Sequence, residues 1–310
     1  MNSYPYLSDI LNAWFGTDWY IPIAMFGTFV ALALIIASGI ARKEFLRYER
    51  IGILPSSINT SKGKVSPHQL IQDLVIICVI FGLVGARIFH ILDYPSEFLS
   101  NPAGMIFSRA GFSIYGGLVF GISAGIMFLR KHSVPIIVSL DAVAPAMILG
   151  YGIGRLGCQI SGDGDWGIPS NMSLKPTWVP EWFWAQIYEN NILGIDIPAP
   201  GVYPTPLYEF VMALLIFSVL WTIRKRIKTP GGLFSIYLVL SGFERLLIEK
   251  IRINREISVF DYSFTQAEII SIFVIILGLV GTLITSNLKV AGKIGISFAI
   301  VGALTACATI

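Results

Sequence analysis

Long apolar runs constrain the fold of this chain more than any other feature of its sequence. The first run, residues 20–41, is 22 residues long and holds no charged side chain. A helix of about 20 apolar residues crosses the roughly 30 Å hydrocarbon core of a bilayer, and continuous runs of this kind differ from the alternating strands of a membrane β-barrel. We therefore predict an all-α polytopic membrane protein with about seven transmembrane helices, at residues 20–41, 71–92, 111–129, 134–154, 204–223, 232–248 and 269–286.

The composition agrees with a membrane protein. Of the 310 residues, 55% are hydrophobic and only 13% are charged. The mean hydropathy of +0.72 exceeds what a soluble domain of this length needs to fill its core, so the excess must face lipid. No repeat or soluble domain is visible, which predicts a single membrane domain over residues 1–310. The end of the chain, residues 287–310, is expected to form either an eighth helix or a tail lying on the membrane surface.

The basic residues predict topology rather than a polyanionic partner. The net charge is only +3, and the basic residues lie at the ends of apolar runs, so nucleic acid is not expected as a partner. Of the 22 lysines and arginines, 14 follow odd-numbered spans and 6 follow even-numbered spans, which places the N-terminus outside by the positive-inside rule. Residues 158–203 then form an outer-face head whose four tryptophans are expected to anchor at the membrane interface.

The cysteines give no sign of a metal or disulfide framework. Cys78, Cys158 and Cys307 are far apart and form no CxxC pattern. The acidic pair Asp163 and Asp165 lacks the further oxygen ligands of a calcium loop. We therefore expect no metal and no cofactor.

Several charged residues lie where lipid would penalise them by roughly 2.5 to 3.5 kcal/mol each, so they are expected to face a protein interior or a watery cavity. Glu209, like Asp73, lies near a helix end and can also reach water there. Arg245 and Glu249 are four residues apart, which places them on one helix face as an ion pair. The charged residues within or next to spans are Asp73, Arg87, Asp141, Arg155, Glu209, Glu244, Arg245 and Glu249.

Three glycine- or proline-rich elements lie at outer helix ends. Residues 154–167 place five glycines and two carboxylates around Arg155; glycine lets backbone approach a ligand closely, and an arginine fork matches phosphate oxygens. Residues 111–118 open the third span, after which Gly117, Gly121 and Gly125 repeat at the spacing of a close helix contact. Residues 203–209 begin the fifth span, at a position where proline costs little.

These elements, in this order, resemble the prolipoprotein diacylglyceryl transferase family. The matching segments are Gly85-Ala86-Arg87-Ile88-Phe89-His90, Ile114-Tyr115-Gly116-Gly117, Gly154-Arg155-Leu156-Gly157, Pro204-Thr205-Pro206-Leu207-Tyr208-Glu209 and the helix from Glu244 through Arg245 and Glu249 to Arg252. The resemblance implies a seven-helix membrane body with an outer-face head, in the bacterial cytoplasmic (inner) membrane. It also implies transfer of the diacylglyceryl group of phosphatidylglycerol to the lipobox cysteine at the end of a prolipoprotein signal peptide, with release of glycerol phosphate.

The resemblance also assigns residues to the site. Arg155 and Arg245 match the family's two essential arginines, and Tyr115 stands at the position of the family's base. Apart from the resemblance, His90 in the second span is a second candidate base, with a packed core histidine as the alternative interpretation. The residues expected to bind substrate are Arg87, Gly116, Gly117, Gly154, Gly157, Cys158, Asp163, Gly167, Tyr208, Glu209, Glu249 and Arg252.

Two departures from the family pattern leave other functions open. Cys158 stands where the family has Asn, and Tyr115 stands where many members have a histidine, which is the better base near neutral pH. One alternative is a relative that uses another acceptor or has lost catalysis. Another is a lipid transporter, whose charged residues would form a translocation path, although the inverted repeats it predicts are not found.

Overall fold

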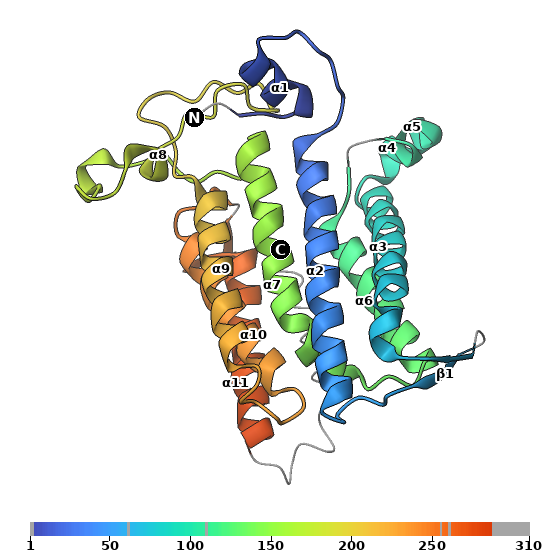
Figure 1. Ribbon diagram of the computed structural model, residues 1–310. Helices are drawn as coiled ribbons and strands as arrows, with labels where there is room; N and C mark the ends of the chain where they lie inside the picture. Colours follow the sequence, from blue (N-terminus) through green and yellow to red (C-terminus); the bar gives the residue numbers. More distant parts are fainter. Residues whose placement is uncertain (1–2, 61–62, 109–110, 255, 260–261, 287–310) are drawn as a thin grey trace. The chain divides into compact units, whose positions relative to one another are not determined.

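The computed structural model describes residues 3–60, 63–108, 111–254, 256–259 and 262–286 (Figure 1). The expected eighth helix or tail, residues 287–310, lies outside the described residues. The helices are α1 (Leu7–Phe15), α2 (Met25–Arg50), α3 (Ile71–Asp93), α4 (Pro95–Ser100), α5 (Pro102–Ile106), α6 (Ile114–Lys131), α7 (Ile136–Ser161), α8 (Glu181–Trp184), α9 (Thr205–Ile223), α10 (Gly232–Glu249) and α11 (Gln266–Ser286).

Six of the described helices are long and apolar enough to cross a membrane: α2, α3 with the 3-10 turn before it, α6, α7, α9 and α11. This confirms the predicted class, an all-α polytopic membrane protein. The seventh expected span is present as the helix α10, which is not among these six and carries three charged residues, Glu244, Arg245 and Glu249, within its 18 residues.

The ends of the helices differ most from the predicted spans in α2 and α7. α2 begins at Met25 and continues to Arg50, past the expected end at residue 41. α7 continues to Ser161, past the expected end at residue 154. The segment that holds Arg155 and Cys158 is therefore helical and not a loop, because its glycines are spaced apart by good helix formers.

Short strands were not predicted. β1 (Ile58–Thr60) pairs antiparallel with β2 (Gly63–Val65), and β3 (Glu256–Val259) pairs antiparallel with β4 (Tyr262–Thr265). Both are hairpins between helices, so the class stays helical.

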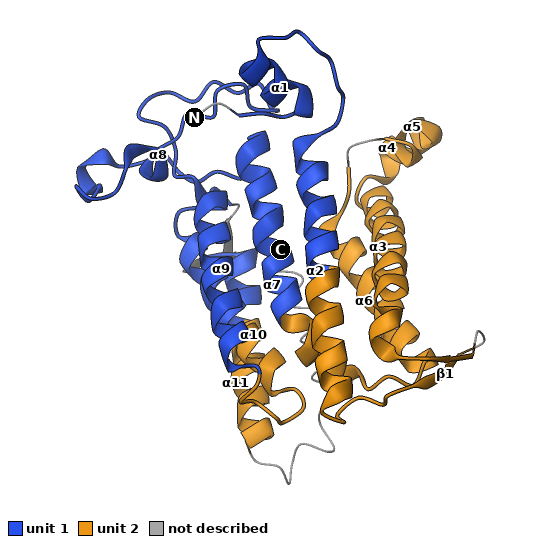
Figure 2. Ribbon diagram, viewed as in Figure 1, with its two compact units in different colours: residues 1–37, 145–224, 240–272 blue, residues 38–144, 225–239, 273–310 orange. Residues whose placement is uncertain are grey.

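The chain divides into two compact units, coloured in Figure 2. Unit 1 comprises Met1–Ala37, Pro145–Arg224 and Leu240–Ile272; unit 2 comprises Ser38–Ala144, Lys225–Val239 and Phe273–Ile310. The single domain over residues 1–310 stays a prediction.

In unit 2, glycines bring α3 and α6 into close contact. A Cβ on Gly116 would overlap the Gly85 carbonyl, and one on Gly121 would lie 3.2 Å from the Cys78 carbonyl. The predicted small-residue contact face of the third span is therefore confirmed, and its partner is α3.

Also in unit 2, a buried carboxylate caps the start of α10. Asp141 is 2% exposed, and it accepts the backbone N–H groups of Gly231 at 2.6 Å and Phe234 at 2.8 Å. These N–H groups have no partner within the helix, and the helix dipole favours a negative charge there. The intramembrane charge of Asp141 thus stabilises a helix end.

In unit 1, the N-terminal segment is bonded to the head and to α7. The N–H of Ser3 donates to the Glu189 carbonyl at 2.7 Å, and the N–H of Tyr4 donates to the Ile160 carbonyl at 2.7 Å. The head has its own small core, formed by Trp166, Tyr188, Ile197 and Val202.

Candidate active site

Three arginines surround the carboxylate of Glu209 in unit 1. Glu209 lies near the start of α9 and is 0% exposed, so the expectation that it reaches water is wrong. Arg155 of α7 binds one carboxylate oxygen through Nε at 2.7 Å and Nη2 at 2.6 Å. Arg245 of α10 and Arg252, just beyond α10, each approach the other oxygen at 3.3 Å. The buried negative charge is thus compensated by cations from two other parts of the chain.

Asp165, in the loop after α7, joins two of these arginines. It accepts Arg155 Nη1 at 2.5 Å and Arg252 Nη2 at 2.8 Å. Its backbone carbonyl accepts the hydroxyl of Thr205, at the start of α9, at 2.6 Å. Burial raises the pKa of Asp165, but the attraction of Arg155 and Arg252 outweighs burial and lowers this pKa to about 2. Sequence analysis did not assign Asp165 to the site, although it lies two residues from Asp163.

On the α10 side, the site contains a further ion pair and a buried N–H group without a hydrogen-bond partner among the described residues. Arg245 Nη2 lies 3.0 Å from Glu249, which confirms the predicted pair. The other oxygen of Glu249 accepts the side-chain amide of Asn254 at 2.6 Å. Arg245 Nε is buried and has no hydrogen-bond partner among the described residues. Because an unmatched buried donor is costly, this N–H is available to an oxygen of a bound ligand.

Tyr151 links two carboxylates within the site. Its hydroxyl lies 3.0 Å from Glu209 and 3.4 Å from Glu244, and it has one proton to donate to them. Sequence analysis missed this tyrosine. It lies four residues before Arg155, and that spacing puts both side chains on one face of α7.

Cys158 and Asp163 lie on the other side of Arg155. The Cys158 sulfur is 3.4 Å from Arg155 Nη1. Burial raises the pKa of Asp163, and the neighbouring charge of Asp165 raises it further. The side chains of Cys158, Asp163 and Asp165 lie within 4.8 Å of one another, but a metal cation among them would meet the Arg155 guanidinium. The positive charge of Arg155 therefore disfavours a metal cation at this position.

The residues of this site follow the order and spacing of a known family. The sequence pattern described as prolipoprotein diacylglyceryl transferase matches residues 15–284. The chain belongs to the prolipoprotein diacylglyceryl transferase family.

Several members of the diacylglyceryl transferase family match this chain over most of their length, at 26–29% identity. The chain is 27% identical to a protein of Leptospira interrogans, with 88% of this chain and 92% of the relative covered. It is 26% identical to a protein of Clostridium novyi, with 86% of this chain and 93% of that protein covered. A protein of Corynebacterium glutamicum is 29% identical to this chain, with 76% of this chain and 72% of that protein covered. All three are named phosphatidylglycerol–prolipoprotein diacylglyceryl transferase.

Many of the residues that the family motifs assign to the site lie together in unit 1. They are Arg155, Cys158, Asp163, Glu209, Arg245, Glu249 and Arg252. Their side chains come from α7 and the loop after it, from α9, and from α10 and the segment beyond it, so that three separate stretches of this family member build one charged cluster.

The other motif residues of unit 1 support the cluster through packing. A Cβ on Gly157 would lie 2.7 Å from Phe29 of α2, whereas one on Gly154 would meet nothing within 4 Å. Gly167 pairs with Arg252 in a β-bridge, and a Cβ there would overlap the Ile251 carbonyl. The hydroxyl of Tyr208 donates to the Phe183 carbonyl at 2.7 Å. Gly167 thus allows the loop to approach the segment that carries Arg252.

The remaining motif residues belong to unit 2. Arg87 donates to the carbonyls of Met105 at 3.1 Å, Gly111 at 3.0 Å and Ser108, so its guanidinium holds the chain between α5 and α6. His90 lies against Gly111, where a Cβ would overlap its ring. Tyr115 is 43% exposed.

The glycines of the same motif are used for helix packing. A Cβ on Gly116 would meet Phe89 of α3 at 2.6 Å, and one on Gly117 would meet Ala86 at 3.5 Å. The family's Gly-Gly pair therefore allows α6 to pack closely against the Gly-Ala-Arg segment of α3.

Proposed function

We propose that this chain transfers the diacylglyceryl group of phosphatidylglycerol to the lipobox cysteine thiol of prolipoproteins and releases glycerol phosphate. The cluster of three arginines around the buried carboxylate of Glu209, in a member of this family, carries the proposal. A cluster of this kind recognises an anionic lipid headgroup, and zwitterionic headgroups suit it less well.

The reaction that we propose is a displacement at the glycerol carbon bonded to the phosphate oxygen. The cysteine sulfur forms a bond to this carbon while the carbon–oxygen bond breaks. The electron pair of that bond leaves on glycerol phosphate, and the thiol gives up its proton. Charge grows on the phosphate as the bond breaks, and guanidinium groups held in a low-dielectric site stabilise that charge.

The bond lengths at Glu209 suggest different tasks for the arginines. Arg155 makes short bonds to Glu209 and Asp165, between 2.5 and 2.7 Å, which suit a positioning residue. Arg245 and Arg252 meet Glu209 at 3.3 Å, and Arg245 Nε is unused. We therefore propose that Arg245 and Arg252 bind the phosphate directly. Arg155 holds the Glu209 carboxylate, which in turn positions Arg245 and Arg252.

The acceptor thiol needs only modest activation, because a free cysteine has a pKa near 8.5. The positive field of the arginines lowers the pKa of a thiol beside them. Tyr115 and His90, which belong to unit 2, are the side chains that we propose as bases.

As a member of this family, the chain is a multi-pass bacterial membrane protein. We propose that it lies in the cytoplasmic membrane with its N-terminus and its head, residues 158–203, outside. That placement would put the arginine cluster on the side to which precursors are exported.

The reaction itself tests the proposal. Purified protein in detergent receives phosphatidylglycerol and a lipobox peptide, and glycerol phosphate release is followed over time. We expect release that requires the peptide's cysteine, and little release with phosphatidylethanolamine.

The same assay separates the alternatives. Release with a Cys→Ser peptide would assign another acceptor, which the departures at Cys158 and Tyr115 would then explain. No release from a folded protein would indicate a relative that has lost catalysis.

A further inference from the structure

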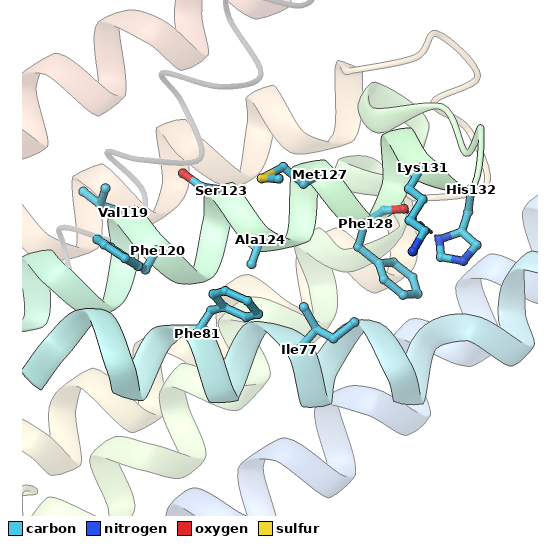
Figure 3. Close-up of a pocket in the computed structure, with 10 residues that line it drawn as sticks. All are labelled: Ile77, Phe81, Val119, Phe120, Ser123, Ala124, Met127, Phe128, Lys131 and His132. Carbon is cyan, nitrogen blue, oxygen red and sulfur yellow. Dashed lines mark hydrogen bonds between the residues drawn. The ribbon is translucent and has the colours of Figure 1, made fainter. Parts of the chain in front are cut away.

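A groove runs between α3 and α6 in unit 2 (Figure 3). Ile77 and Phe81 of α3 form one wall, and residues of α6 from Val119 to Lys131 form the other. The middle of the groove is apolar and contains the small side chain of Ala124, while Lys131 and His132 lie together at one end (Figure 3). The volume of the groove is about 660 Å³.

The length of the groove fits one leaflet of a bilayer. Val119 and Lys131 are 12 residues apart on α6, which corresponds to about 18 Å along a helix. One leaflet contributes about half of the roughly 30 Å hydrocarbon core. Because α6 is itself a membrane-crossing helix, the groove runs along the direction of the acyl chains, and its charged end lies at the depth of the headgroups.

The charged end is suited to a phosphate. No carboxylate of the described residues lies within ion-pair distance of Lys131, which is exposed. The ring of His132 packs on Phe128 with centroids 4.2 Å apart, and its Nδ1 lies 2.8 Å from the Phe128 carbonyl. That contact fixes the imidazole beside the lysine. Lys131 thus presents a positive end to an otherwise apolar channel, with the His132 ring beside it.

We propose that this groove binds one acyl chain of an anionic phospholipid, whose phosphate contacts Lys131 and His132. The site is separate from the arginine cluster and does not depend on the transferase reaction. The small side chain of Ala124 leaves room for the acyl chain, and the lysine selects lipids with a net negative charge, because a basic residue at the membrane surface attracts them.

A phospholipid with a photoactivatable group in the middle of one acyl chain tests this site. The purified full-length protein is placed in nanodiscs that contain labelled phosphatidylglycerol or labelled phosphatidylcholine, without any acceptor peptide. After irradiation, the labelled positions are mapped by mass spectrometry. We expect adducts on Phe81 and Met127 to be about fivefold more abundant with the anionic lipid. The exposed residues Ile76 and Ile80 of α3 report ordinary contact with lipid and should show no preference.

Three variants complete the test. Lys131→Gln should remove the preference for the anionic lipid, whereas Arg130→Gln, the adjacent cation outside the groove lining, should keep it. Ala124→Leu should fill the groove and reduce the adducts from both lipids, and its elution profile in size-exclusion chromatography reports whether it folds.

Two outcomes would overturn the assignment. Equal labelling by both lipids, unchanged in Lys131→Gln, would mean ordinary contact with surrounding lipid. Labelling of Ile76 and Ile80 without any labelling of the groove would mean that another occupant, such as a second copy of the chain, covers it.

Discussion

The Arg155 guanidinium holds the buried carboxylate of Glu209 through two nitrogens, at 2.7 and 2.6 Å. The same carboxylate also meets two further arginines and a tyrosine. The Glu209 carboxylate therefore holds all three arginines of the site in position. Because Glu209 is fully buried, its negative charge is stabilised by these side chains and not by bulk solvent.

Replacing Glu209 with Gln should disrupt the site more than any surface change. It leaves three arginines without their shared carboxylate, and breaking a buried ion pair from one side costs about 3–5 kcal/mol. We expect a clearly lower melting temperature in detergent and loss of glycerol phosphate release. Glu181→Gln, at an exposed glutamate of α8, is the control and should match the parent protein. A Glu209→Gln protein as stable as the parent would show that the arginines do not depend on this carboxylate.

Lysine substitutions separate positioning from phosphate binding. Lysine keeps the charge and lacks the fork, so Arg245→Lys should lower kcat/KM by about 10²–10³-fold, as loss of a transition-state donor does, with little change in melting temperature. Arg155→Lys should lower both activity and melting temperature, because its short bonds to Glu209 and Asp165 are lost. Full activity in Arg245→Lys would contradict its assignment to the phosphate.

Tyr151→Phe tests the link between two carboxylates. Removing the hydroxyl leaves Glu209 and Glu244 without this donor, which should cost about 1–3 kcal/mol. A double-mutant cycle with Glu244→Gln should give a coupling energy of at least about 0.5 kcal/mol, because the two side chains share the hydrogen bond. Additive effects in the free energy of unfolding would show that the 3.4 Å contact contributes nothing.

The stability contributed by Asp165 should depend on pH. Its pKa is about 2 in the folded chain, below the usual 3.8, so its ionised form favours folding. This contribution is complete above pH 3.8 and is lost as the pH falls through about 2. Melting temperatures of the parent protein and Asp165→Asn should therefore converge between pH 4 and pH 2. Asp163 has the opposite shift, so Asp163→Asn should be more stable than the parent protein at neutral pH. A constant difference between the parent and Asp165→Asn across this range would contradict the ion pairs.

Topology follows from the distribution of basic residues and is checked with reporter fusions. Fusions after Arg50 and Lys228 should report a cytoplasmic location, and one near Asn190 should report the outside. A reporter at Ile310 will be outside if an eighth helix crosses the membrane and cytoplasmic otherwise. A cytoplasmic signal at Asn190 would reverse the assignment.

The spans and the charged cluster were predictable because each has a strong local signal. Continuous apolar runs predict helices, and charges such as Glu209 and Arg245 within them require a protein interior. The glycine stripe of α6 predicted a close contact, although not that α3 is its partner, because a small-residue face does not specify what packs on it.

Other features depend on the folded chain. Tyr151 belongs with Arg155 only because α7 continues to Ser161, and tyrosine is common at membrane boundaries for other reasons. Arg87 was expected to bind substrate, and its guanidinium donates to the carbonyls of Met105 in α5 and of Ser108 and Gly111 before α6. Those carbonyls have no signature in the sequence, since every residue carries one.

The backbone bonds of Ser3 and Tyr4 have a consequence for biosynthesis. Their acceptors are the carbonyls of Glu189 and Ile160, so during synthesis Ser3 and Tyr4 must wait for partners that are made more than 150 residues later. At about 5–20 residues per second, that delay is on the order of ten seconds or more. During this time Ser3 and Tyr4 lack these two acceptors, and an affinity tag fused before them would compete with the formation of the two bonds. Expression with the tag at the carboxyl end should therefore give the better yield of folded protein.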